Sequence, residues 1–250
     1  MDEAYGGTVP VYGGSAADDD LRGEWRVFAG ATVAREGFAL IGFATPREVH
    51  GSFVAGYAPT AMRGIVTAAT GRIVQTIDGQ PAARVYDGWS GGRISAQLAT
   101  GGVVLAATSL QPVGRQIDRV GSVPRYLLSH PHEVLPGGSL AFFTDMKVGD
   151  ELVLMLGSSD SLLDRTRVVA HRALGAGSAP LAGGVLTYCG GCGGVIEDTG
   201  ARRVAQLFAE RIGSAPFIGA ATFGEQGCFL DPTPTNRHGN LMCNAVLFER

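Results

Sequence analysis

The chain has 250 residues, enough for one large domain or two modest ones, and 45% of them are hydrophobic while 17% are charged. This composition is typical of a globular protein, and the net charge of -3 offers no basic face to a nucleic acid. The sequence has no apolar run long enough to span a membrane, no N-terminal secretion signal, and too few cysteines, four, for a disulfide scaffold. We therefore expect a soluble cytoplasmic protein with reduced thiols.

Two stretches near the ends of the chain resemble each other. Val9–Asp20 reads VPVYGGSAADDD and Ala215–Gln226 reads APFIGAATFGEQ. In each, a proline precedes two apolar residues and a glycine, and an acid, Asp19 or Glu225, stands nine positions after the proline. Each copy later resumes an apolar strand after a glycine, which predicts two related strand–loop–strand units. The resumed strands are expected to begin at Gly37 and Gly239.

Strands dominate the middle of the chain. The stretch GIVTAATGRIVQTIDGQPAARVYDGW predicts two strands that turn at Thr70–Gly71. A second turn at Asp78–Gly79 then leads into a helix opened by Pro81. Further on, SLAFFTDMKVGDELVLMLG predicts a strand, a Gly-Asp turn and another strand.

Helices alternate with strands in the last third. Ser158–Leu174 is predicted to be a helix, with serine and aspartate at its start and apolar residues along one side. These apolar residues are Leu162, Val168, Val169 and Leu174. A fully buried strand at Gly184–Tyr188 precedes a second helix, which is capped near Asp198–Thr199 and stopped by Gly213. The order of elements predicts an α+β fold of layered mixed β-sheets with flanking helices.

The last elements define the candidate site. A helix between two strands carries the chain back, so Phe217–Thr222 should lie parallel to and beside Gly184–Tyr188. The end of that strand would then lie beside the cysteine turn, and the Asn236–Asn240 loop would enter the last strand from the same edge of the sheet, where ligands commonly bind. The candidate ligand-binding residues are Cys189, Cys192, Glu225, Gln226, Asn236, Arg237, His238 and Asn240.

Each candidate also has a simpler interpretation. The Cys189-x-x-Cys192 pair is compatible with a redox couple or half a zinc site completed by Cys228 or His238, but small apolar thiols beside a Gly-Gly turn are more common. Glu225 and Arg237 are compatible with ordinary solvated side chains. Glycines on both sides of Glu225 and Gln226 favour a site, because they let the backbone pass close to a ligand.

Other polar motifs are weaker. The histidines of SHPHE, His130 and His132, are expected to be exposed at a proline turn and not to form a metal pair. The serines of GSSDS are expected to cap a helix and not to supply a nucleophile. The chain shows no clear catalytic constellation, so we do not expect an enzyme.

Several stretches resemble one family. TYCGGC, PFIGAATFGEQG and NRHGNLMCNAVLF, in that order, resemble the C-terminal part of a FIST (F-box and intracellular signal transduction) sensory protein. VTAATGRIVQTIDGQPAARVYDGW resembles the start of the FIST C module, and VPVYGGSAADDD with the strand after it resembles the end of the FIST N module. The resemblance implies the C-terminal remnant of a truncated FIST N module at residues 1–48 and a FIST C module at residues 49–250.

The resemblance implies a function. FIST proteins are described as intracellular sensors proposed to bind small ligands such as amino acids, and many are fused to or encoded beside histidine kinases, cyclic-di-nucleotide enzymes or chemoreceptor output modules. For such a ligand, Arg237 would hold an anionic group, Glu225 would accept from an amine, and Gln226 and Asn240 would give polar specificity. The family offers no agreed catalytic residues to transfer to this chain.

Two alternatives remain open at this point. One is a thiol-dependent enzyme or redox protein that uses Cys189 and Cys192, with His238 or Glu225 as the base. The other is a haem or zinc sensor in which His238 or a cysteine is the ligand, since some FIST members are described as haem-binding.

Overall fold

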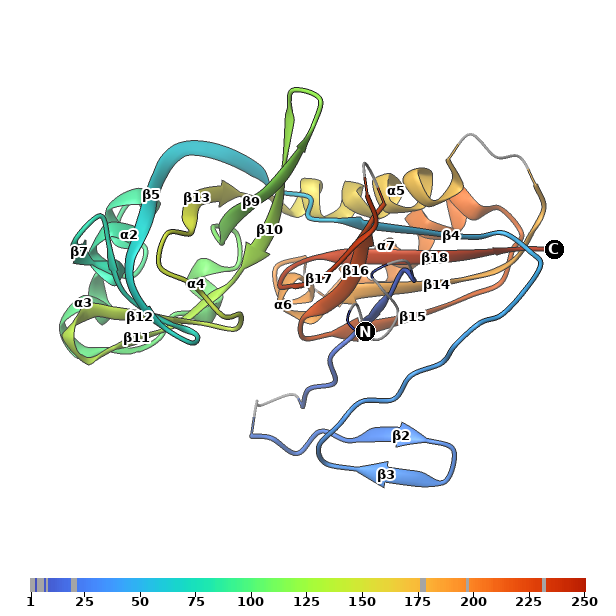
Figure 1. The fold of residues 1–250 in the computed structure, drawn as a ribbon, viewed down its shortest axis with the longest axis horizontal. Helices are drawn as coiled ribbons and strands as arrows, with labels where there is room; N and C mark the ends of the chain where they lie inside the picture. Colours follow the sequence, from blue (N-terminus) through green and yellow to red (C-terminus); the bar gives the residue numbers. More distant parts are fainter. Residues whose placement is uncertain are drawn as a thin grey trace.

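The computed structural model describes Glu3, Gly7 and residues 9–18, 22–175, 179–196, 198–230 and 233–250, with Asp198 and Thr199 as backbone only. Figure 1 shows two lobes side by side, with a small N-terminal hairpin that extends away from both. We call residues 58–156 the middle lobe. We call the terminal lobe strand β4 (Val49–Val54) together with the described part of residues 158–250.

The middle lobe is a curved sheet with short helices against it. The strands are ordered β10-β9-β13-β5-β6-β12-β11-β8, and β7 pairs with β6. The elements are β5 (Ala58–Thr70), β6 (Ile73–Ile77), β7 (Gln80–Pro81), α2 (Ala82–Ser90), α3 (Ser95–Thr100), β8 (Gly102–Val103), α4 (Leu105–Thr108), β9 (Val113–Val120), β10 (Val123–Ser129), β11 (Pro131–Leu135), the 3-10 turn η1 (Pro136–Gly138), β12 (Ser139–Phe142) and β13 (Glu151–Leu156).

The predicted turns of this lobe are confirmed. The chain turns between β5 and β6 after Thr70, and Asp78 and Gly79 both take positive φ angles, 50° and 75°, between β6 and β7. Pro81 then stands directly before α2 as its N-cap residue, with a φ of -51°. The buried side of α2 packs on the sheet through Tyr86, whose hydroxyl donates to Gln111 O at 2.7 Å.

The terminal lobe is a mixed sheet backed by two helices. The strand order is β15-β14-β18-β4, with β14 and β15 parallel and the other pairs antiparallel. The helices α5 and α7 pack on each other, and α5 also contacts β4 and β18. The elements after β4 are α5 (Ser159–Leu174), β14 (Leu181–Cys189), α6 (Gly190–Gly193), α7 (Asp198–Ile212), β15 (Phe217–Thr222), β16 (Glu225–Phe229), β17 (Thr235–Gly239) and β18 (Cys243–Glu249).

Helix α5 forms as its sequence predicts. The Ser158 hydroxyl accepts from the backbone N–H of Ser161 at 3.1 Å, and the Ser161 hydroxyl accepts from the N–H of Ser158 at 2.9 Å. This reciprocal cap satisfies two of the donors that the first helical turn leaves open. Leu162 and Val169 are fully buried on the side that faces the sheet.

A third, smaller sheet crosses the open face of the terminal lobe. The β16–β17 hairpin lies in front of the main sheet in Figure 1, and β1 (Gly13–Gly14) pairs with β16 antiparallel. The Asn244 side chain, on β18, holds this layer by donating to Gly13 O at 2.8 Å and to Gln226 O at 2.9 Å. The two similar stretches of the sequence therefore meet in space through β1 and β16.

The α+β class and the mixed sheets with flanking helices are confirmed, while several local expectations are wrong. The Asn236–Asn240 loop is largely strand β17, because it pairs with β16. Gly37–Ala44 forms no strand: Phe38 and Ile41 remain 85% and 77% exposed, although the Phe43 ring packs on that of Phe248 with centres 5.2 Å apart. A pattern of this kind needs a pairing partner to become a strand.

Strand β14 and the N-terminal arm also differ from the expectations. Strand β14 is not fully buried, since Val185 is exposed on the open face. An additional hairpin, β2 (Val27–Ala29) with β3 (Thr32–Ala34), forms in the N-terminal arm. Asp19 lies outside the described residues, as do the side chains of the Asp198–Thr199 cap.

Candidate functional site

The site begins where β14 and β15 end side by side. Cys189 is paired with Thr222 in the parallel β14–β15 ladder. Strand β16 starts at Glu225, three residues after Thr222. The helical turn α6 follows Cys189 directly and contains Cys192. The sequence therefore brings the two cysteines and Glu225 to one edge of the sheet, as parallel neighbouring strands require.

Glu225 is buried inside this edge. It has no exposed surface, and its two carboxyl oxygens accept from the Thr222 hydroxyl and from the Met242 N–H, both at 2.9 Å. Burial raises the pKa of Glu225 to about 8 despite these two hydrogen bonds. Glu225 is therefore mainly protonated at neutral pH.

Arg165 is a site residue that the sequence analysis missed. Its guanidinium is buried, with Nη1 donating to Leu241 O at 2.6 Å and to Ala55 O at 3.1 Å, and it lies 4.1 Å from the centre of the Tyr188 ring. In the described part of the chain, Nε and Nη2 of Arg165 have no hydrogen-bond partner. The available signal was its position on α5, three residues after Leu162 on the apolar stripe.

Cys192 is the group that can balance this charge. Burial alone would raise its pKa, but the neighbouring Cys189, the charge of Arg165 and the contact with Tyr57 together lower the pKa of Cys192 to about 6. The Tyr57 hydroxyl lies 3.5 Å from the sulfur. The hydrogen bond to Cys192 and burial raise the pKa of Cys189 well above its ordinary value. The buried guanidinium of Arg165 therefore favours the thiolate form of Cys192. We call Arg165, Cys189, Cys192 and Glu225 the inner cluster.

Polar side chains from three segments form an outer cluster on the other side of the β16 strand. The Gln226 Nε2 lies 2.8 Å from His238 Nδ1 and 3.1 Å from the Ser15 hydroxyl. Gly224, with a φ of 99°, lets the backbone pass under the imidazole, since a side chain there would meet His238 at 2.7 Å. We call Ser15, Gln226 and His238 the outer cluster.

The outer cluster lies near the middle lobe. The positive charge of Arg72 contributes to lowering the pKa of both His238 and His132, although burial is the larger cause for each. Arg72 also makes an exposed ion pair with Asp145 at 3.5 Å. Asn240 connects the lobes directly, because its Oδ1 accepts from the His130 N–H at 3.1 Å.

The expectation of two exposed histidines was wrong. His130 is 3% exposed, its Nε2 lies 3.1 Å from Leu105 O, and burial lowers its pKa to about 4. His132 is half-buried and stacks on Phe143 with ring centres 4.4 Å apart. Both imidazoles pack against residues of the middle lobe, and the proline turn does not expose them.

Two predicted site residues lie apart from the others. The Asn236 amide binds the N-terminal segment, accepting from Val11 N at 2.8 Å and donating to Val9 O at 3.0 Å. Arg237 is exposed, and its Nη1 donates to the neighbouring Asn236 O at 2.9 Å. The guanidinium that acts on Glu225 is Arg165, not Arg237.

The predicted zinc completion is not assembled among the residues that the structure describes, because no group of three or more His, Cys, Asp and Glu side chains gathers there. The four cysteines are all buried and unbridged. The described helices also include none with the length and apolar character needed to cross a bilayer.

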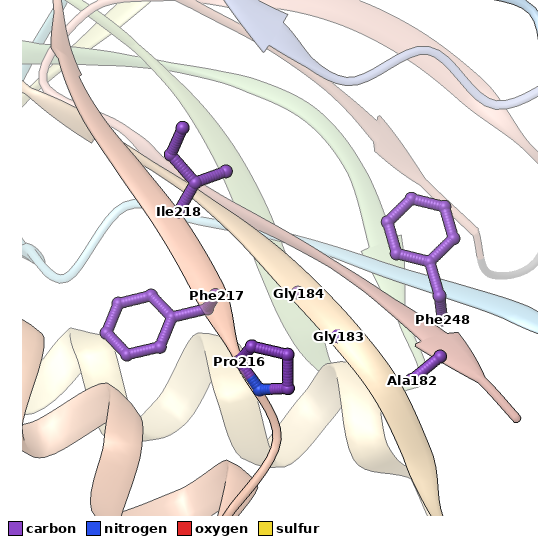
Figure 2. A pocket seen from close by; sticks show the side chains of 7 residues that line it. All are labelled: Ala182, Gly183, Gly184, Pro216, Phe217, Ile218 and Phe248. Atoms are coloured by element: carbon purple, nitrogen blue, oxygen red, sulfur yellow. The ribbon is translucent and has the colours of Figure 1, made fainter.

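A shallow depression lies at the opposite end of β14 from the cysteines. Its volume is about 390 Å³, and Figure 2 shows Ile218 and Phe248 beside it on the open sheet face. The lining residues are Ala182, Gly183, Gly184, Pro216, Phe217, Ile218 and Phe248. Because this lining is apolar, the depression lacks the polar groups that orient a charged ligand. The polar side chains of the candidate site lie at the other end of β14, near Cys189.

The fold and the site define a two-lobed α+β protein whose polar groups gather where the lobes meet. The family model described as FIST C domain matches residues 82–228, and the FIST N domain model matches residues 1–80. The chain therefore belongs to the FIST family of sensory signal-transduction domains, which confirms the resemblance seen in the sequence. No curated protein and no solved structure matches the chain. The domain boundary after residue 48 stays a prediction.

Proposed function

We propose that this FIST chain senses a small anionic or zwitterionic ligand, such as an amino acid, and signals to a separate output protein. The ligand binds at the outer cluster. The observation that carries the proposal is the hydrogen bonding of Gln226 to both His238 and Ser15, which joins the β16–β17 hairpin to a distant N-terminal segment. A histidine kinase or a cyclic-di-nucleotide signalling protein is the class of output partner that the family suggests.

The outer cluster has the features of a preorganised polar site. Gln226 already hydrogen-bonds to both Ser15 and His238, so little rotamer freedom is lost when a ligand binds. The Arg72 charge is close enough to influence His238 and would favour an anionic group there. An imidazole with a lowered pKa is neutral at pH 7 and accepts or donates one hydrogen bond, whereas a bound carboxylate would favour its protonated form.

The position of the cluster links binding to signalling. Gln226 is adjacent in β16 to the buried Glu225, and His238 is two residues from Asn240, which binds the middle lobe through His130. A ligand held between these residues and Arg72 would contact both lobes, so its binding would change how firmly the lobes are held together. The changed lobe contact is the signal that the output protein would read.

A thermal-shift screen against amino acids and small carboxylates tests the proposal. A ligand at 100 times its dissociation constant stabilises the folded state by about 2.7 kcal/mol, which is readily visible as a rise in Tm. The rise should vanish in Gln226→Ala and His238→Ala and persist in His171→Ala, a matched change at an exposed residue of α5. A ligand whose effect depends on Arg237 and not on Gln226 would move the site away from the outer cluster to the exposed Arg237.

A further inference from the structure

The inner cluster contains a pair of thiols that the proposed ligand site does not use. Cys189 stands at the N-terminus of the turn α6 and Cys192 is its third residue, with both thiols buried and unbridged. Two intervening residues in a helical turn bring the Cα atoms of such a pair into the range that a disulfide requires. The geometry therefore permits a bond between the two sulfur atoms.

Arg165 favours the thiolate form of one of the two cysteines. A guanidinium keeps its proton in proteins, so this buried cation needs an anion nearby. Glu225 is mostly protonated at pH 7 and cannot fully supply one. The thiolate of Cys192 is the remaining candidate in the inner cluster, and it is also the form in which a cysteine is nucleophilic. The titratable and charged groups that act on Cys192 are Cys189, Arg165, Tyr57, Glu225, Tyr188 and Cys243.

Both thiols are buried beneath the glycine-rich turn, with Cys189 4% exposed and Cys192 fully buried. The turn consists of glycines around Cys192, and a methyl group added at Gly193 or Gly194 would meet nothing within 4 Å, so this side of the turn has open space. Gly191 lies over Cys189, with its Cβ position 3.7 Å from the sulfur. A small shift of this turn would admit a molecule of the size of water or hydrogen peroxide, while a larger reagent would need local unfolding.

We propose that Cys189 and Cys192 are a reversible oxidation site for hydrogen peroxide, in which Cys192 is the attacking thiolate and Cys189 the resolving thiol. The Cys192 sulfur attacks one peroxide oxygen and the O–O bond breaks, giving a sulfenic acid and a hydroxide that takes up a proton as water. The Cys189 thiol loses its proton as its sulfur attacks Cys192, and the S–O bond breaks with release of a second water. Two thiols and one peroxide thus give one disulfide and two waters.

Oxidation of the two thiols would change contacts outside the inner cluster. The Tyr57 hydroxyl donates to Ser109 O of the middle lobe at 2.8 Å and lies 3.5 Å from Cys192. Disulfide formation removes the negative charge beside Tyr57 and leaves Arg165 without its anion. Because a buried unpaired cation is costly, the segments that hold Arg165 through Ala55 O and Leu241 O would rearrange. Peroxide therefore becomes a second input to the contact between the lobes.

Tryptic mapping after peroxide treatment tests the proposal on the intact protein. Cys189 and Cys192 fall in one peptide, between Arg172 and Arg202, while Cys228 and Cys243 fall in two others, on either side of Arg237. The first peptide should lose two hydrogens and resist alkylation, and a dithiol should restore both thiols. The buried Cys228 and Cys243 are internal controls and should stay reduced at the same dose. Oxidation of Cys243 as fast as the pair would overturn the proposal.

The pH dependence of the oxidation rate tests the role of Arg165. In the wild-type protein the rate should reach half its plateau near pH 6, and a midpoint near the ordinary thiol value of 9 would overturn the proposed thiolate. In Arg165→Met the midpoint should rise by more than about one pH unit, whereas Arg165→Lys should stay closer to the wild type. Cys189→Ser should accumulate a sulfenic acid at Cys192 that dimedone labels. The wild-type profile decides the question even where a variant fails to fold.

Discussion

Replacement of Glu225 by glutamine should change how the stability of the fold depends on pH. Glutamine has the same shape, and its amide can hydrogen-bond to the Thr222 hydroxyl and to the Met242 N–H in place of the carboxyl group. The difference is that glutamine does not titrate. In the wild type, the carboxyl group ionises near 4.5 when unfolded and near 8 when folded.

The sign and size of the effect follow from these two values. As the pH rises from 4.5 to 8, the unfolded chain loses this proton while the folded protein keeps it, so the wild type loses stability across that window. Each pH unit costs about 1.4 kcal/mol, which amounts to about 3 kcal/mol at pH 7. The glutamine variant lacks this loss. Its free energy of unfolding should therefore rise relative to that of the wild type as the pH increases.

Urea unfolding of both proteins at several values between pH 5 and pH 8 measures the difference. Glu36→Gln, the same change at an exposed residue, controls for the loss of one negative charge. A difference that does not vary with pH would refute the reasoning, and so would a wild type that gains stability relative to the variant. The second outcome would mean that Glu225 is ionised in the folded protein and paired with Arg165.

Two further changes test the packing around the site. Ser158→Ala removes the cap of α5 and should lower the free energy of unfolding by about 1 kcal/mol, measured by urea unfolding. Gly227→Ala would place a methyl group 2.2 Å from the Phe53 ring, so either β16 or β4 must shift, at a cost of about 1–3 kcal/mol. Gly193→Ala, where nothing lies within 4 Å, should be nearly neutral in the same assay. Equal effects of the two glycine changes would contradict the packing described here.

The sequence predicted those parts of the fold that depend on local chemistry and short connections. The serine cap and apolar stripe define α5 without reference to the rest of the chain. The parallel pairing of β14 with β15 follows from a single intervening helix. The convergence of Cys189 and Glu225 at one sheet edge then follows from that pairing.

The other features of the fold and the site depend on tertiary contacts that a sequence pattern does not show. Arg165 lies on the apolar side of α5, but a charged residue in a helix is usually at the surface. His130 is buried by the meeting of two lobes that are distant in sequence. The apolar run from Gly37 fits a strand pattern and yet residues 37–44 form no strand. Long-range contacts decide all three outcomes.

The most direct test of the proposed sensory site uses the histidine resonances of the protein during titration with a ligand from the thermal-shift screen. The chain has five histidines, at positions 50, 130, 132, 171 and 238, so single substitutions can assign every imidazole signal. The account predicts that the His238 signal moves with the ligand concentration and that the His171 signal stays in place. A ligand that stabilises the protein without moving the His238 signal would contradict the outer cluster as its binding site.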